Sequence, residues 1–213
     1  DGQYHAWTEI NVPQRPFEIE NVDTVTVPLA QSGYTTEYLR YRITINDRPN
    51  ETNYYRIVID KQTTLWGYNH EEGGDDYIYW TKHSYNFIGR EDVVLTDGQP
   101  TTGDDEDNGL FDTAKNIYGV FDDTRFRNTS YTMTVYNNTK IETGSDSGYF
   151  SGMDVIIRLM SITETEYYYL KALNLVDSDA YDETINEPIK YPSNVHGLSL
   201  IHISEPTRLR RIS

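Results

Sequence analysis

Two segments with alternating side chains, residues 38–45 and 54–60, constrain the fold of this chain most strongly. Alternation of apolar with mainly polar residues is the pattern of a β-strand that buries one face and exposes the other. The faces predicted to be buried consist of Tyr41, Ile43, Ile45, Tyr55, Ile57 and Ile59. A fold that contains both strands must place a hydrophobic core against each of these faces.

The segment that joins the two runs, residues 46–53, favours an exposed connection. Pro49 has no N–H to donate to a β-ladder, and Asn and Asp side chains form local turns with their own backbone. Because the two runs have matched lengths, we expect an antiparallel hairpin in which residues 38–45 pair with residues 54–60 across a long loop.

Later segments predict two more strands and a helix. Residues 130–136 alternate as a strand, and residues 153–162 have an apolar content that indicates a strand buried on both faces. Thr163 and Glu166 fit a capping box, so a helix is expected from about Thr163 to Val176. Its apolar stripe is predicted to be Tyr169, Ala172, Leu173 and Val176.

These elements together predict the fold class. The chain is expected to be mainly β: an antiparallel β-sandwich or partly closed barrel with one C-terminal helix packed on it. A length of 213 residues is sufficient for a substantial core.

Charge and composition exclude several classes of function. The chain has 34 Asp and Glu against 18 Lys and Arg, and a net charge of -16 repels phosphate backbones and anionic membranes. The absence of Cys removes thiolate nucleophiles and thiolate metal ligands. The sequence contains no nucleophile elbow and no phosphate-binding loop. We therefore expect a non-catalytic protein that needs no cofactor and binds no nucleic acid.

The acidic run at residues 104–107 is the candidate metal site of the sequence. Asp104 and Gly109 match the first and sixth positions of an EF-hand loop, but Lys115 stands where that loop has its bidentate Glu. The segment is therefore either a looser Ca²⁺ site or a solvated loop. The ligands of such a Ca²⁺ site would be Asp104, Asp105 and Asp107.

Aromatic residues are dense on both sides of a turn at residues 73–76. Their rings either pack on a sheet, as is usual for strand residues, or form an exposed platform for a sugar or a peptide. Exposed rings beside a carboxylate pair would favour a carbohydrate ligand, whereas buried rings would favour a scaffold. The residues concerned are Trp66, Tyr68, Tyr77, Tyr79 and Trp80.

Several short segments in a fixed order carry a family resemblance. They are Asn46–Arg56 (NDRPNETNYYR), Phe121–Asp123 (FDD), Ser130–Thr132 (SYT), Glu166–Leu170 (EYYYL) and Tyr191–Gly197 (YPSNVHG). In this order they resemble a Bacteroidetes lipoprotein family, domain-of-unknown-function family 4249. The resemblance implies an exported, lipid-anchored envelope protein that is often encoded beside a TonB-dependent outer-membrane receptor. It implies no catalytic residues.

The resemblance leads to a specific expectation about this chain. Residues 1–197 are expected to form a single β-rich domain, the C-terminal portion of a longer lipoprotein anchored to the outer membrane. It is predicted to be non-catalytic, and either to bind a glycan or peptide ligand or to assist a TonB-dependent outer-membrane transporter. The alternative is an extracellular glycan-binding or glycan-cleaving module.

Residues 198–213 resemble the translation of a sequencing-library adapter, and the family pattern implies a glycine-rich closing strand in their place. We predict that this tail is not native. Its deletion should leave the thermal unfolding midpoint unchanged or raise it, because an accidental sequence was not selected to complement the core. Loss of folding on deletion, or recovery of the same tail by independent sequencing of the source gene, would contradict the prediction.

Overall fold

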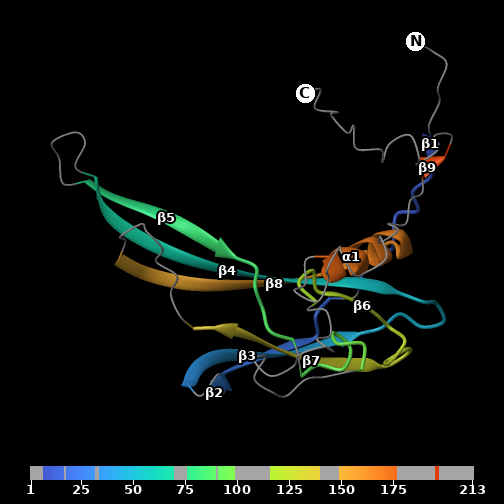
Figure 1. Ribbon diagram of the computed structural model, residues 1–213, viewed down its shortest axis with the longest axis horizontal. Helices are drawn as coiled ribbons and strands as arrows, with labels where there is room; N and C mark the ends of the chain where they lie inside the picture. The colour runs from blue at the N-terminus through green and yellow to red at the C-terminus, as the bar shows by residue number, and fades with distance from the viewer. Residues whose placement is uncertain are drawn as a thin grey trace, which may run out of the picture.

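The computed structural model describes residues 7–16, 18–31, 34–69, 76–89, 91–98, 116–139, 149–176 and 195–196. Across these residues the chain is mainly β, with two larger antiparallel sheets and a helix near the C-terminal end (Figure 1). A small ribbon pairs β1 (Trp7–Thr8) with β9 (Val195–His196) beyond the helix. The predicted fold class is confirmed, and the separate sheets form a sandwich.

The first sheet has the order β2-β3-β7, with both pairings antiparallel. Its strands are β2 (Asn21–Gln31), β3 (Tyr34–Asn46) and β7 (Ser130–Asn138). The register aligns Ile43 of β3 with Val22 of β2 and with Met133 of β7. The strand predicted over residues 130–136 is therefore confirmed.

The second sheet is organised around the long central strand β4. Its strands are β4 (Tyr54–Asn69), β5 (Asp76–Ser84), β6 (Val120–Asp122) and β8 (Tyr149–Ile162). Because β8 pairs with β4 over residues 54–66, β6 and β5 share the other edge, at residues 54–56 and 61–69. Beyond residue 60, strands β4, β5 and β8 continue as a three-stranded arm that reaches past the first sheet (Figure 1).

The predicted hairpin between residues 38–45 and 54–60 is wrong. Strand β3 pairs with β2 and β7, whereas β4 pairs with β5, β6 and β8, so the two runs lie in different sheets. Their predicted faces are nevertheless buried against each other: Ile43, Ile45, Ile57 and Ile59 are at most 1% exposed. The segment between the runs therefore crosses from one sheet to the other.

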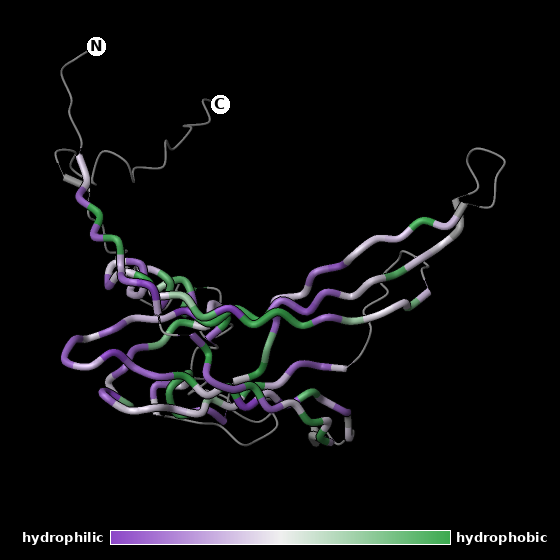
Figure 2. Tube along the Cα trace, turned by 180° about the vertical axis from the view of Figure 1, so that it is seen from behind, coloured by the Kyte–Doolittle hydropathy of each residue, from purple (hydrophilic) through white to green (hydrophobic). Residues whose placement is uncertain are grey.

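The hydrophobic core fills the space between the two sheets. Figure 2 shows hydrophobic stretches gathered where the sheets overlap, while the arm is mostly pale or hydrophilic. The ring of Tyr55 lies 5.5 Å from that of Phe121 and 6.4 Å from that of Phe126, distances typical of favourable aromatic pairs. The buried cluster comprises Tyr41, Ile43, Ile45, Tyr55, Ile57, Ile59, Val94, Leu95, Phe121, Phe126, Met133 and Val135.

Helix α1 (Glu164–Val176) covers the outer face of the second sheet. It begins where the capping signal predicts, because the Thr163 hydroxyl accepts a hydrogen bond of 3.1 Å from the Glu166 N–H. At this end the molecule has three layers: the first sheet, the second sheet and the helix (Figure 1).

The apolar stripe predicted for the helix is correct at Leu173, which packs against the cluster beneath the helix, but wrong at Tyr169. The buried residues are Tyr167, Leu170 and Asn174, whereas Tyr169 is 43% exposed. Polar contacts select this face: the Tyr167 hydroxyl donates to Asp122 (3.3 Å), and Asn174 hydrogen-bonds the segment before β6. A count of apolar residues alone misses such contacts.

Burial of β8 on both faces is also not observed. β8 pairs with β4 alone, so it lies at an edge of the second sheet. Val155, Ile157 and Leu159 pack against the core, while the outward residues Asp154, Ile156 and Arg158 are exposed, Ile156 at 37%. The outer face of this strand therefore mixes charged with apolar side chains, and its apolar content does not reflect burial.

The core assignment is tested by placing a charge in it. Ile57→Asp should lower the free energy of unfolding by about 3 to 5 kcal/mol, because it buries an unpaired carboxylate. Val25→Asp, at a position 44% exposed in β2, is the matched control and should change stability by about 0.5 kcal/mol or less. Urea unfolding measures both, and equal effects of the two substitutions would refute the assignment.

Candidate functional site

The strand-loop-strand motif that carries the family resemblance builds a buried polar network. Asp47 is 6% exposed and accepts hydrogen bonds from the Tyr55 hydroxyl (3.0 Å) and the Asn128 N–H (2.9 Å). Burial, followed by this bond to Asp47, raises the pKa of Tyr55 above its ordinary value, so the phenol remains a neutral donor. The network therefore ties the crossing segment to the loop before β7.

Asp123 has the same role on the other side of the crossing. It is fully buried and accepts hydrogen bonds from the Asn53 N–H (2.8 Å), the Asn53 side-chain amide (3.0 Å) and Arg127 (3.2 Å). Every carboxylate oxygen of Asp47 and Asp123 accepts at least one of the bonds in this network. Satisfied buried carboxylates of this kind stabilise loops, so we assign them a structural role.

The predicted Ca²⁺ ligands Asp104, Asp105 and Asp107 lie outside the described residues. In the part of the chain that the structure describes, no three His, Cys, Asp or Glu side chains are grouped to hold a metal ion. Within the same residues, no helix combines the length and hydrophobicity needed to cross a membrane.

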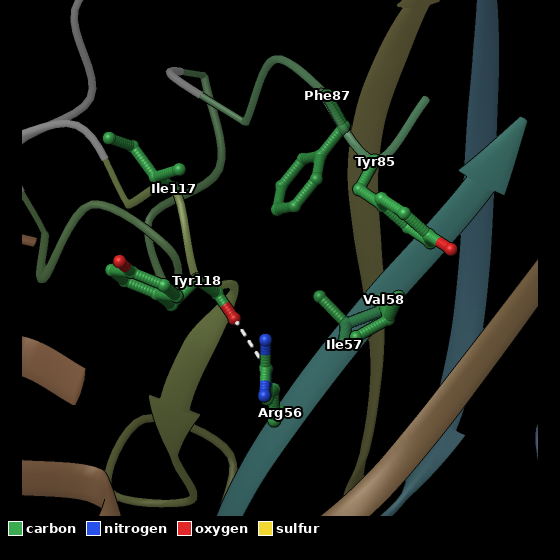
Figure 3. A pocket seen from close by; sticks show the side chains of 7 residues that line it. All are labelled: Arg56, Ile57, Val58, Tyr85, Phe87, Ile117 and Tyr118. Carbon is green, nitrogen blue, oxygen red and sulfur yellow. Dashed lines mark hydrogen bonds between the residues drawn. The ribbon is translucent and has the colours of Figure 1, made fainter. Parts of the chain in front are cut away.

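A small pocket opens on the edge of β4 between the points where β6 and β5 join it (Figure 3). Its volume is about 230 Å³, below the range of about 300 to 1,000 Å³ common for small-molecule sites. The Arg56 side chain donates from Nε to the Tyr118 carbonyl (3.1 Å) and so supports the pocket wall. The remaining lining residues are Ile57, Val58, Tyr85, Phe87 and Ile117. This size and lining do not make the pocket our candidate site.

The arm presents a cluster of rings that we call the aromatic face: the exposed Tyr77, Tyr79 and Tyr149 around the half-buried Trp66. The register pairs Trp66 with Tyr79 on β5 and with Tyr149 on β8, so these three side chains share one side of the sheet. The Trp66 ring stacks on Tyr149 at 4.7 Å and lies 5.6 Å from Tyr77. Tyr77, Tyr79 and Tyr149 are 58%, 66% and 60% exposed.

On the opposite side of the arm, an aromatic ring packs on the sheet. Trp80 pairs with Leu65, and its ring lies over Gly67, where an added Cβ would meet it at 3.2 Å. Leu65 itself is fully buried. The rings of the aromatic segment thus differ in exposure: Trp80 packs on the sheet, whereas Tyr77 and Tyr79 are exposed beside the half-buried Trp66. The Tyr68 side chain lies outside the part of the chain that the structure describes.

Two rows of smaller and polar side chains continue the aromatic face along the arm. The first row contains Thr64, Thr81 and Gly152, and a Cβ added at Gly152 would meet nothing within 4 Å. The second row contains Gln62, His83 and Asp154. We call the first row the open strip, because its side chains are short and Gly152 leaves open space between the rings and the polar row.

Sequence reasoning missed Tyr149 and Gly152 because a β-bulge brings them together. The register shifts between Thr64 and Leu65, so Ser151 is an extra residue on β8. Without the bulge, positions 149 and 152 would point to opposite faces. No local pattern in the sequence marks this shift.

Asp60 is the buried carboxylate at the inner end of this surface. It is 2% exposed and accepts from Gln62 (2.8 Å) and Arg158 (3.5 Å), with His83 Nδ1 at 2.9 Å. Burial alone would raise the pKa of Asp60, but the bonds from Gln62 and His83 and the nearby positive charges lower it below its ordinary value. The group therefore remains ionised and is a poor proton donor.

The chain is thus an antiparallel β-sandwich whose second sheet extends into an arm with an exposed aromatic face. Comparison with protein families matches residues 1–199 to the family described as domain of unknown function DUF4249. The chain belongs to this family. No match was found among curated proteins or among solved structures.

Because the pKa of Asp60 is lowered in the folded state, the free energy of unfolding should depend on this group at acidic pH. Its contribution is complete above the unfolded pKa of about 3.9 and is lost as the pH falls through the lower folded pKa. Asp60→Asn should therefore flatten the fall in unfolding free energy on acidification, measured by urea unfolding at a series of pH values. Asp154→Asn, an exposed position on the same face, should leave that dependence as in the parent. Parallel curves for the parent and Asp60→Asn would refute the assignment.

Proposed function

We propose that this chain is a non-catalytic ligand-binding module of the cell envelope, and that it binds its ligand on the aromatic face of the arm. The observation that carries the proposal is the exposure of Tyr77, Tyr79 and Tyr149 beside Trp66 on one side of the sheet. Large rings gathered on one exposed surface are a common feature of binding sites, because burying them on association is favourable.

The arrangement favours binding over cleavage. Hydrolysis of a glycosidic bond needs one carboxylic acid that stays protonated and a second carboxylate across the scissile bond. Asp60 is held ionised by Gln62, His83 and Arg158, which does not suit the acid role. Asp154, exposed on the same surface, provides an acceptor for a ligand in our proposal.

The cellular setting in the proposal rests on the family resemblance. A Bacteroidetes lipoprotein encoded beside a TonB-dependent receptor would be anchored to the outer membrane and would pass its ligand to that transporter. The projecting arm supports this role, since it places the aromatic face away from the sandwich core (Figure 1). The high negative charge is compatible with a neutral ligand and disfavours an anionic one.

A thermal-shift screen tests the binding role. We expect a member of an oligosaccharide or peptide library to raise the unfolding temperature, because a ligand that binds the folded state stabilises it by about 2.7 kcal/mol at 100 times its dissociation constant. The double substitution Tyr79→Ala and Tyr149→Ala should abolish this rise.

The control for this screen is Tyr169→Ala, which removes a ring that is 43% exposed on helix α1, far along the sheet from the arm. Its thermal shift should match that of the parent protein. A shift that survives the double substitution, or that is lost equally in the control, would count against the aromatic face as the site. Co-purification with the neighbouring receptor after crosslinking tests the transport role separately.

A further inference from the structure

We infer that the ligand of the aromatic face is a neutral oligosaccharide, which stacks on the ring row and extends over the open strip at Gly152. The inference rests on the proposed function and names the chemical class that this surface suits.

The ring row has the dimensions of a short carbohydrate chain. Tyr79, Trp66 and Tyr149 stand side by side on three adjacent strands. Strands in a sheet are about 4.8 Å apart, so the row is about 10 Å long, which is close to the length of a disaccharide. Trp66 and Tyr149 stack on each other, so each covers one face of the other. The C–H groups of a pyranose ring carry partial positive charge and stack on the negative face of an aromatic ring, here on the faces that this pair leaves uncovered and on Tyr79.

The open strip gives the sugar chain a path along the arm. Gly152 lies in the row next to the rings, and space surrounds the position of its absent Cβ. Thr64 and Thr81 occupy the same row with short hydroxyl side chains. A ligand seated on the ring row can therefore continue past it at Gly152, where open space replaces a side chain.

The polar row beyond the strip supplies the hydrogen bonds that a sugar requires. Gln62 and His83 each direct one nitrogen to Asp60. The row offers a ligand the Gln62 carbonyl oxygen, His83 Nε2 and the exposed Asp154 carboxylate. Sugar hydroxyls both donate and accept, so they match this mixture of groups.

Two further features favour a glycan over a protein or a polyanion. The ring row and the two rows beside it combine aromatic and polar side chains with no aliphatic residue, whereas the cores of protein interfaces are more uniformly apolar. The net charge of -16 opposes the approach of an anionic polymer. A neutral oligosaccharide satisfies both conditions.

Affinity gel electrophoresis tests the inference with soluble glucan, mannan, xylan and galactan as neutral probes and polygalacturonate as the anionic probe. We expect at least one neutral glycan to retard the protein and polygalacturonate not to do so. Tyr149→Ala and Gly152→Val should each weaken the retardation at least tenfold, the first by removing a stacking ring and the second by filling the strip.

Gly152→Val is informative because it should preserve or improve folding: the site has open space, and Val favours strands more than Gly does. Tyr169→Ala serves again as the control and should bind like the parent. Retardation that survives Gly152→Val and Tyr149→Ala would overturn the inference. A peptide that binds in a Tyr149-dependent manner, with no glycan bound, would overturn the glycan class and leave the proposed binding function intact. Absence of binding by both classes would overturn both.

Discussion

The crossing between β3 and β4 is the constraint on which the rest of the structure depends. Residues 47–53 leave one sheet and enter the other, so their backbone groups lose the ladder as a source of hydrogen bonds. The buried Asp123 carboxylate accepts from the Asn53 N–H, and Asp47 accepts from the Asn128 N–H, which ties the crossing to the loop before β7. Asn50 completes the turn with a positive φ of 68° and an N–H bond of 2.8 Å to Asn128.

Once the crossing is fixed, the two apolar faces must meet and the remaining layers follow. Helix α1 then covers the outer side of the second sheet through Tyr167 and Leu170. The Asn174 amide bonds Asn116 (3.0 Å) and accepts from the Tyr118 N–H (3.1 Å), which holds the helix to the segment before β6. Polar contacts thus orient each layer, while the hydrophobic clusters provide most of the cohesion.

The sequence predicts which faces are buried better than which strands pair. A hairpin and a sheet-to-sheet crossing bury the same alternate residues, so the pattern at Ile43 and Ile57 cannot distinguish them. The helix start was predictable because Thr163 acts locally, whereas the buried face depends on Asn174, whose partners lie far away in sequence. The ring platform needed the register of β8 and its bulge, which are likewise long-range properties.

The proposed binding surface on the arm lies apart from the residues that stabilise the sandwich. Its rings stand on strands, and Leu65 with Trp80 supports the opposite side, so the ring row is preorganised and a ligand need not order a loop to bind. The Asp47 and Asp123 network lies at the other end of β4, where β6 pairs with it. Distant sites without shared partners contribute almost additively. Substitutions on the aromatic face should therefore leave the stability of the core unchanged, so the proposed binding role can be tested without unfolding the sandwich.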